Sequence, residues 1–181
     1  MYKIIVNKKN QIVSMKIFKN NLLIITLLLL IYPQFLLCQN FDENIRTKTL
    51  KQAIIGKKII YGKWNISGGM ETHLTYLGKV KTKKDKVYHL MNYVWIWGLS
   101  KRATNKILVY NDLNEYVGEY NLIMMSDLPA RLEKNKLIFE NKNNDCDARV
   151  ISKINFSNGI PKEFFRKCTE VHGDTFHFFS S

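Results

Sequence analysis

The sequence predicts an all-β protein, a mostly antiparallel barrel or sandwich of roughly eight or nine strands, preceded by a short helix and a signal peptide. Three observations lead to this fold class. Segment 87–97 contains no glycine, proline or carboxylate and ends in the largely aromatic run 93–97. Other segments of strand length follow one another with short polar connections. The Asn158-Gly159 dipeptide has the composition of a tight turn between two strands.

Segment 87–97 is expected to be the central strand, because both of its faces are largely apolar. Side chains alternate along a strand, so the residues fall into two sets. One set is His89, Met91, Tyr93, Trp95 and Trp97, and the other is Tyr88, Leu90, Asn92, Val94 and Ile96. Both faces should therefore be covered by other parts of the chain.

The remaining elements follow in chain order. Residues 41–55 have the spacing of a short amphipathic helix, which Gly56 would end. Residues 81–86 are expected to form a charged turn, and 98–105 a polar loop. Strands are expected at 58–66, 72–80, 87–97, 106–110, 116–122, 136–140, 149–156, 160–167 and 174–179.

The first 38 residues have the pattern of a secretory signal peptide. A basic start is followed by the apolar run 22–32 and a cleavage point before Gln39, and Met15 is the expected initiator. The expected organisation is a signal peptide over 1–38, an N-terminal segment with the helix over 39–56, and one β domain over 57–181. The protein would then be periplasmic or secreted.

Two alternatives would keep the chain at a membrane. An uncleaved leader would act as an anchor, although the apolar run is short for a membrane span. Lipid attachment at Cys38 is the second alternative. A bacterial lipoprotein signal resembles a short apolar box with a small residue before the cysteine, whereas Leu37 occupies that position here.

The net charge narrows the choice of partners. The leader contains five of the 28 basic residues and none of the 15 acidic ones, so the rest of the chain has a net charge of +8, against +13 for the whole. A basic protein attracts phosphates, anionic lipids or acidic polysaccharides. Nucleic acid is the least accessible of these partners for an exported protein, and the membrane would be reached only through the leader.

Cys146 and Cys168 are the thiols that remain after cleavage, and an even pair in an exported protein predicts one disulfide. The turn at Asn158-Gly159 would bring them to nearly opposed positions. The alternative is a metal site that adds His172 and a further ligand such as His177 or Asp174, but it lacks the paired spacing of zinc sites.

The tryptophans are the candidate ligand-binding residues, together with Tyr93. Gly62-Lys63-Trp64 resembles the Gly-x-Trp that opens lipocalin-like barrels, and this resemblance implies an interior cavity for an apolar ligand. Tyr93, Trp95 and Trp97 would fill a core, line such a cavity or form a platform for sugar rings. Packing in the core is the default interpretation for Trp64, Trp95 and Trp97, because large aromatic side chains are mostly buried.

A second candidate site is a basic patch. It consists of Lys79, Lys81, Lys83, Lys84 and Lys86, with Arg102 added if the two loops share one end of the domain. Such a patch would bind phosphate or carboxylate groups. The alternative is a solvated turn without a partner.

The chain contains no local motif for catalysis, a metal or a cofactor. Glu71 with His73, and His172 with Asp174, are pairs without a third member at a meaningful spacing. We therefore expect a non-catalytic binding or accessory module whose partner is a small apolar ligand, an acidic polysaccharide or a protein. The alternatives are a hydrolytic enzyme with a dispersed site and an inhibitor or immunity-type protein.

Overall fold

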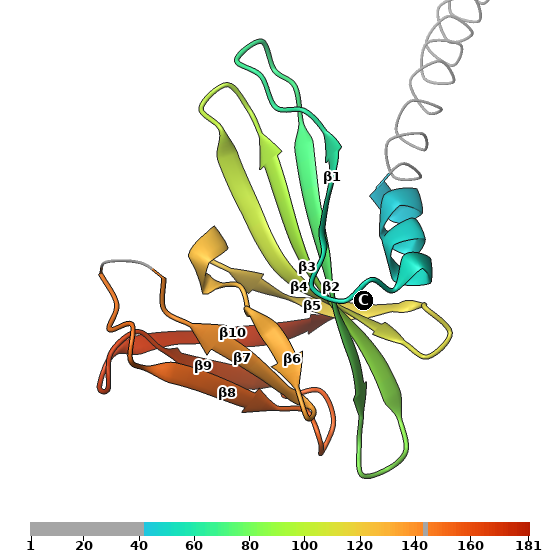
Figure 1. The fold of residues 1–181 in the computed structure, drawn as a ribbon, viewed down its shortest axis with the longest axis vertical. Coiled ribbons are helices and arrows are strands. Elements are labelled where there is room, and N and C mark those ends of the chain that lie inside the picture. Colours follow the sequence, from blue (N-terminus) through green and yellow to red (C-terminus); the bar gives the residue numbers. More distant parts are fainter. Residues whose placement is uncertain (1–41, 143–144) are drawn as a thin grey trace, which may run out of the picture. The chain divides into compact units, whose positions relative to one another are not determined.

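A computed structural model describes residues 42–142 and 145–181 of the chain (Figure 1). The expected signal peptide over 1–38, including Met15 and Cys38, lies outside the described residues. In the part that is described, no helix is both long enough and apolar enough to span a membrane.

The described residues form one α-helix, residues 42–52, followed by ten strands in two antiparallel sheets. The larger sheet has the order β1-β2-β3-β4-β5-β10-β9, and the smaller has the order β6-β7-β8. The elements are β1 Lys58–Gly62, β2 Glu71–Lys81, β3 Val87–Trp97, β4 Arg102–Asn111, β5 Tyr116–Leu122, the 3-10 turn η1 Met125–Asp127, β6 Arg131–Glu133, β7 Lys136–Glu140, β8 Ile151–Asn155, β9 Glu163–Lys167 and β10 Gly173–Ser180.

The predicted fold class and the helix before the strands are confirmed, and β3 has the predicted bounds. The polar loop predicted over 98–105 is wrong in its second half, because β4 begins at Arg102. This part of the strand has no apolar alternation that would reveal it, because Arg102 and Ala103 are both exposed and the buried residue, Asn105, is polar. Strand β6 was not predicted, because three residues are too few to show a period.

Strand β3 is covered on both faces, as its sequence requires, and each face contributes to a separate core. Leu90 belongs to the first core and Met91, the next residue, to the second. Strand β2 also contributes to both cores, and it has a bulge between Tyr76 and Gly78, where Gly78 has a φ of 129°. A residue with a side chain would be strained in that conformation.

The first core lies between the two sheets and is rich in aromatic side chains. Phe164 of β9 is at its centre, with ring centroids 5.0 Å from Tyr120, 5.3 Å from Phe139 and 5.5 Å from Phe176. The buried members of this core are Leu77, Val80, Leu90, Ile107, Val109, Tyr120, Leu122, Leu137, Phe139, Phe156, Phe164 and Phe176.

The second core lies on the opposite face of the larger sheet, where Ile45 and Leu50 of the helix pack on the strands. The sheet contributes Leu74, Tyr76, Met91, Tyr93, Leu108 and Tyr110. In this core a 3.0 Å hydrogen bond joins Nδ1 of the His89 ring and the Tyr76 hydroxyl. Which of the two atoms is the donor depends on the tautomer of the ring. Burial disfavours the charged form of the ring and so lowers the pKa of His89.

The two sheets meet at two seams, where edges of different sheets lie next to each other. Side-chain hydrogen bonds link the sheets there, whereas in a closed barrel backbone hydrogen bonds between paired strands would do so. At the first seam the Asn135 amide both donates to Lys81 O at 2.9 Å and accepts from Lys81 N at 3.0 Å. At the second, Lys167 N in β9 donates to Ser152 Oγ in β8 at 2.9 Å. The strands therefore form two sheets and not the single barrel that the lipocalin resemblance implied.

The turn at Asn158-Gly159 forms as predicted, and Gly159 has a φ of 124°. Its two flanking strands do not pair with each other, however: β8 pairs with β7, and β9 pairs with β10. The hairpin predicted here is therefore replaced by two neighbouring strands that belong to different sheets.

Candidate functional site

The aromatic stripe on β3 runs from the second core to the partly exposed end of the strand. Tyr93 is 8% exposed and is a member of the second core. Trp95 is half-buried at the margin of that core, and Trp97, one step further along the face, is also half-buried. Their rings stack, with centroids 5.6 Å apart and an interplanar angle of 26°. The stripe is therefore core at Tyr93 and surface at Trp97.

Polar side chains of β4 lie beside these rings. The strand register sets Arg102 opposite Trp97 and Thr104 opposite Trp95. Trp97 Nε1 donates to Thr104 Oγ1 at 3.2 Å, and the Arg102 guanidinium carbon is 5.9 Å from the Trp97 ring centroid. Together with Tyr61, which packs at the same core margin, these side chains form what we call the tryptophan face: Tyr61, Trp95, Trp97, Arg102 and Thr104.

Trp64 is separate from this face. Its backbone N–H donates to Glu71 Oε2 at 3.2 Å and its indole Nε1 donates to Gly98 O at 2.9 Å. Glu71 is opposite Ile96 in the register, so its side chain projects from the other side of the sheet from Trp97. Lys101 Nζ lies 5.0 Å from the Trp64 ring centroid. Trp64 thus fastens the loop after β1 to the turn between β3 and β4.

Glu71 and His73 form a hydrogen-bonded pair through Oε1 and Nε2. This bond is the main reason why the pKa of Glu71 is lowered, and the Trp64 amide adds to the effect. A carboxylate can orient a histidine in this way in a catalytic site, but the pair also needs a nucleophile or a metal. No group of three or more metal-ligating side chains occurs within residues 42–142 and 145–181.

The predicted basic patch is divided by the fold. Lys79, Lys81, Lys83, Lys84 and Lys86 are exposed around the turn between β2 and β3. Arg102 lies at the other end of β3, which at about 3.3 Å per residue is roughly 36 Å long. Lys81 forms a 2.9 Å ion pair with Asp85. The structure therefore places Arg102 with the tryptophan face and leaves the lysines as a separate cluster.

The predicted disulfide is present between Cys146 and Cys168. Its two thiols are therefore not available for the alternative metal site. Asn141 lies beside the bridge, and its Nδ2 donates to Lys167 O at 3.2 Å and to Cys168 O at 3.0 Å. The bridge and Asn141 thus fix one end of the seam between β8 and β9.

Substitution of Cys168 with serine is expected to lower the free energy of unfolding by roughly 2–4 kcal/mol, because the unfolded chain is no longer constrained by a closed loop. Urea denaturation with and without reductant measures this loss. Cys146→Ser and the double variant should show the same loss, since one bond is removed in all three. Labelling of both thiols in the folded wild-type protein would contradict the prediction.

A buried ion pair was not predicted from the sequence. Arg166 Nη1 of β9 lies 3.1 Å from Asp127 Oδ1 of η1, and both side chains are almost fully buried. Arg166 Nη2 also donates to Asn141 Oδ1 at 2.9 Å, and the second Asp127 oxygen accepts from Met124 N at 2.8 Å. These bonds join η1, the end of β7 and β9 inside the molecule, so the cluster is structural.

Comparison of the chain with protein-family models, with curated proteins and with solved structures gave no match, so the tryptophan face is interpreted from its own geometry.

Proposed function

We propose that this chain is an exported, non-catalytic binding module and that it binds an acidic polysaccharide on the tryptophan face. The observation that carries the proposal is the register of β3 against β4, which sets Arg102 opposite Trp97 and Thr104 opposite Trp95. Aromatic rings and hydrogen-bonding groups thus share one face of the sheet.

This combination matches the chemistry of a sugar acid. The apolar face of a sugar ring packs on a tryptophan ring, and Trp95 and Trp97 are both half-buried, so part of each side chain remains open to solvent. A guanidinium group binds a carboxylate through two parallel hydrogen bonds, and Arg102 is exposed at the edge of the stack. The net positive charge of the chain favours approach of a polyanion.

The other candidate partners find less support in this geometry. A small apolar ligand would favour an enclosed cavity. Two hollows in the described part of the chain, of about 480 and 440 Å³, open broadly to solvent. Export is supported by the disulfide, since such bonds persist in oxidising compartments.

The test is binding of polygalacturonate, measured by tryptophan fluorescence and by retardation in an affinity gel, with uncharged dextran as the comparison ligand. Trp97→Ala is expected to weaken binding about tenfold or more, because a lost aromatic contact contributes roughly 1.5–3 kcal/mol. Arg102→Glu should also weaken binding of polygalacturonate, and more strongly at low salt than at high salt.

Two matched variants serve as controls. Trp64→Ala removes a half-buried tryptophan that is not part of the tryptophan face, and Lys83→Glu reverses an exposed charge at the distant turn. Both should bind polygalacturonate as the wild type does. Equal weakening by Trp64→Ala and Trp97→Ala, or equal binding of dextran and polygalacturonate, would refute the proposed site.

A further inference from the structure

Within the part of the chain that the structure describes, the seam between β8 and β9 leaves two strand edges without ladder partners. Strand β8 is last in the order of the smaller sheet, and β9 is last in the order of the larger one. The two strands are neighbours, connected through residues 156–162 and linked by the bond from Lys167 N to Ser152 Oγ. Backbone groups on both edges are therefore directed into the seam without the regular pairing of a sheet.

The direction of these backbone groups follows from bonds at the strand ends. Phe156 N donates to Asn135 O, on the β7 side, so alternation directs the N–H and C=O of Lys153 and Ile151 toward the seam. Cys168 N donates to His172 O, on the β10 side, so the backbone groups of Phe165 are likewise directed toward the seam.

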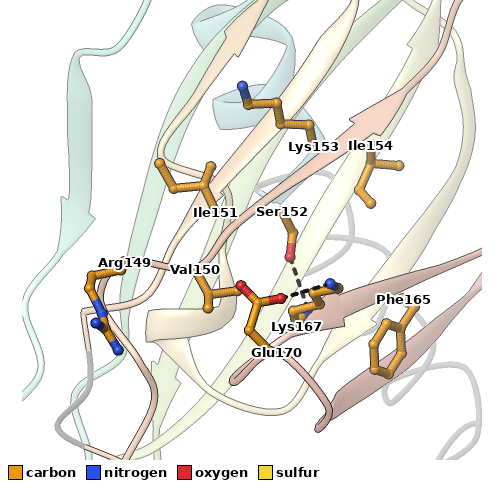
Figure 2. A pocket seen from close by; sticks show the side chains of 9 residues that line it. All are labelled: Arg149, Val150, Ile151, Ser152, Lys153, Ile154, Phe165, Lys167 and Glu170. Carbon is orange, nitrogen blue, oxygen red and sulfur yellow. Dashed lines mark hydrogen bonds and ion pairs between the residues drawn. The ribbon is translucent and has the colours of Figure 1, made fainter.

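A groove of about 480 Å³ lies over this seam (Figure 2). Ser152 and Ile154 also line the groove, although they belong to the less exposed face of β8. The groove therefore reaches the edge of that strand. Two partly exposed apolar side chains also line the groove. Ile151 of β8 is 47% exposed, and Phe165 of β9 is 44% exposed.

The charged side chains of the groove are mainly basic. Arg149, Lys153 and Lys167 line it, against one carboxylate, Glu170. Lys167 Nζ pairs with Glu170 at 3.2 Å, and Arg149 is bonded to Asp147, whose pKa is lowered to about 2 by those bonds. Lys153 projects from β8 at the side of the groove away from Glu170 (Figure 2). The groove therefore complements an acidic occupant.

We propose that this groove binds an extended acidic segment of a partner protein, which aligns along the free edge of β8. The backbone of such a segment pairs with the groups of Ile151 and Lys153, as in other cases of strand addition. Ile151 and Lys153 are on the same face of β8, so two side chains that are two residues apart on the added segment meet them. A carboxylate meets Lys153, and an apolar side chain contacts Ile151 and Phe165. The proposal is independent of the polysaccharide site, which is on β3 and β4.

An extended peptide fits these features better than a saccharide does. The backbone donors and acceptors along a strand edge are spaced by the repeat distance of an extended polypeptide. Another extended polypeptide has the same spacing and can pair with them, whereas a saccharide does not. The groove is lined by Ile151 to Ile154 of β8, which corresponds to roughly 13 Å of extended chain, and by the two residues before the strand.

The test uses fluorescein-labelled hexapeptides with anisotropy as the readout. Their odd positions, which share one face of an extended chain, combine glutamate with valine, leucine or phenylalanine, and their even positions are threonine. We expect the acidic peptides to bind, and the corresponding lysine peptides to bind at least tenfold more weakly. Lys153→Glu should weaken binding of the acidic peptides about tenfold, and Phe165→Ala should weaken it several-fold. Lys162→Glu, an exposed lysine next to β9 but outside the groove, should have no effect.

A backbone-methylated form of the best acidic peptide separates strand addition from simple charge attraction. Methylation of alternate amides removes N–H donors and leaves the carboxylates, so it should abolish binding. Undiminished binding of that peptide, equal weakening by Lys162→Glu and Lys153→Glu, displacement by polygalacturonate, or no binding of any acidic peptide at millimolar concentration would each overturn the proposal. Circular dichroism of each variant confirms that it is folded.

Discussion

Substitution of Arg166 with alanine is expected to lower the free energy of unfolding by about 3–5 kcal/mol. Arg166 is 2% exposed, and its guanidinium bonds to Asp127, Asn141 and Ser126 O. Its removal leaves the Asp127 carboxylate buried without a cation, and an uncompensated buried charge is strongly unfavourable. Urea denaturation at neutral pH measures the change.

Arg149→Ala is the matched control for this variant, because Arg149 also pairs with an aspartate but is exposed. Exposed ion pairs contribute little to stability, so its unfolding curve should stay close to that of the wild type. The double variant Arg166→Met with Asp127→Leu should recover much of the loss, since it removes both charges together. A loss for Arg166→Ala no larger than that for Arg149→Ala would show that the pair is not buried in solution.

The sequence indicates on which face of β9 Arg166 lies, but it does not identify the partner of Arg166. Alternation along 160–167 places Arg166 on the same side of the strand as Phe164, and Phe164 is a core residue. From the pattern alone, Arg166 would be interpreted as an exposed residue near the end of the strand, because arginine is rarely buried without a partner. The partner, Asp127, comes from η1 in a different part of the chain, and no local period reports that contact.

The tryptophan face was foreseen only in part, for a similar reason. Along β3 itself the residues between the rings are Val94 and Ile96, whose side chains project to the other side, so the strand taken alone offers no polar group beside the rings. The polar groups are on β4, at Arg102 and Thr104, in a segment that composition assigns to a loop. Only the register of two strands brings them together.

The features that were predicted well are those with a local physical cause. The two apolar faces of β3 required cover on both sides, and each face has its own core. The Asn158-Gly159 turn forms because its residues suit that backbone. The disulfide was predicted from the expected export of the chain and from an even pair of thiols, and it is present. The pairing of β8 with β7, and of β9 with β10, depends on distant contacts and was missed.

Phe164→Ala is expected to lower the free energy of unfolding by about 3–5 kcal/mol, because it removes the ring that joins Tyr120, Phe139 and Phe176 and leaves a cavity among them. The total stability of a domain of this size is about 5–15 kcal/mol, so the variant should be close to unfolding under mild conditions. Urea denaturation followed by tyrosine and tryptophan fluorescence measures the loss, and Phe164→Leu should show a smaller one.

The adjacent residue provides the control, because Phe165 is on the opposite face of the same strand and is 44% exposed. Phe165→Ala removes the same number of atoms at almost the same position, yet it opens no buried cavity and should cost about 1 kcal/mol or less. Equal losses of unfolding free energy for Phe164→Ala and Phe165→Ala would mean that Phe164 does not face the core and Phe165 the solvent, as described above. If Phe165→Ala is stable and also loses affinity for acidic peptides, the inward side chain of β9 supports the fold while its outward neighbour contributes to binding.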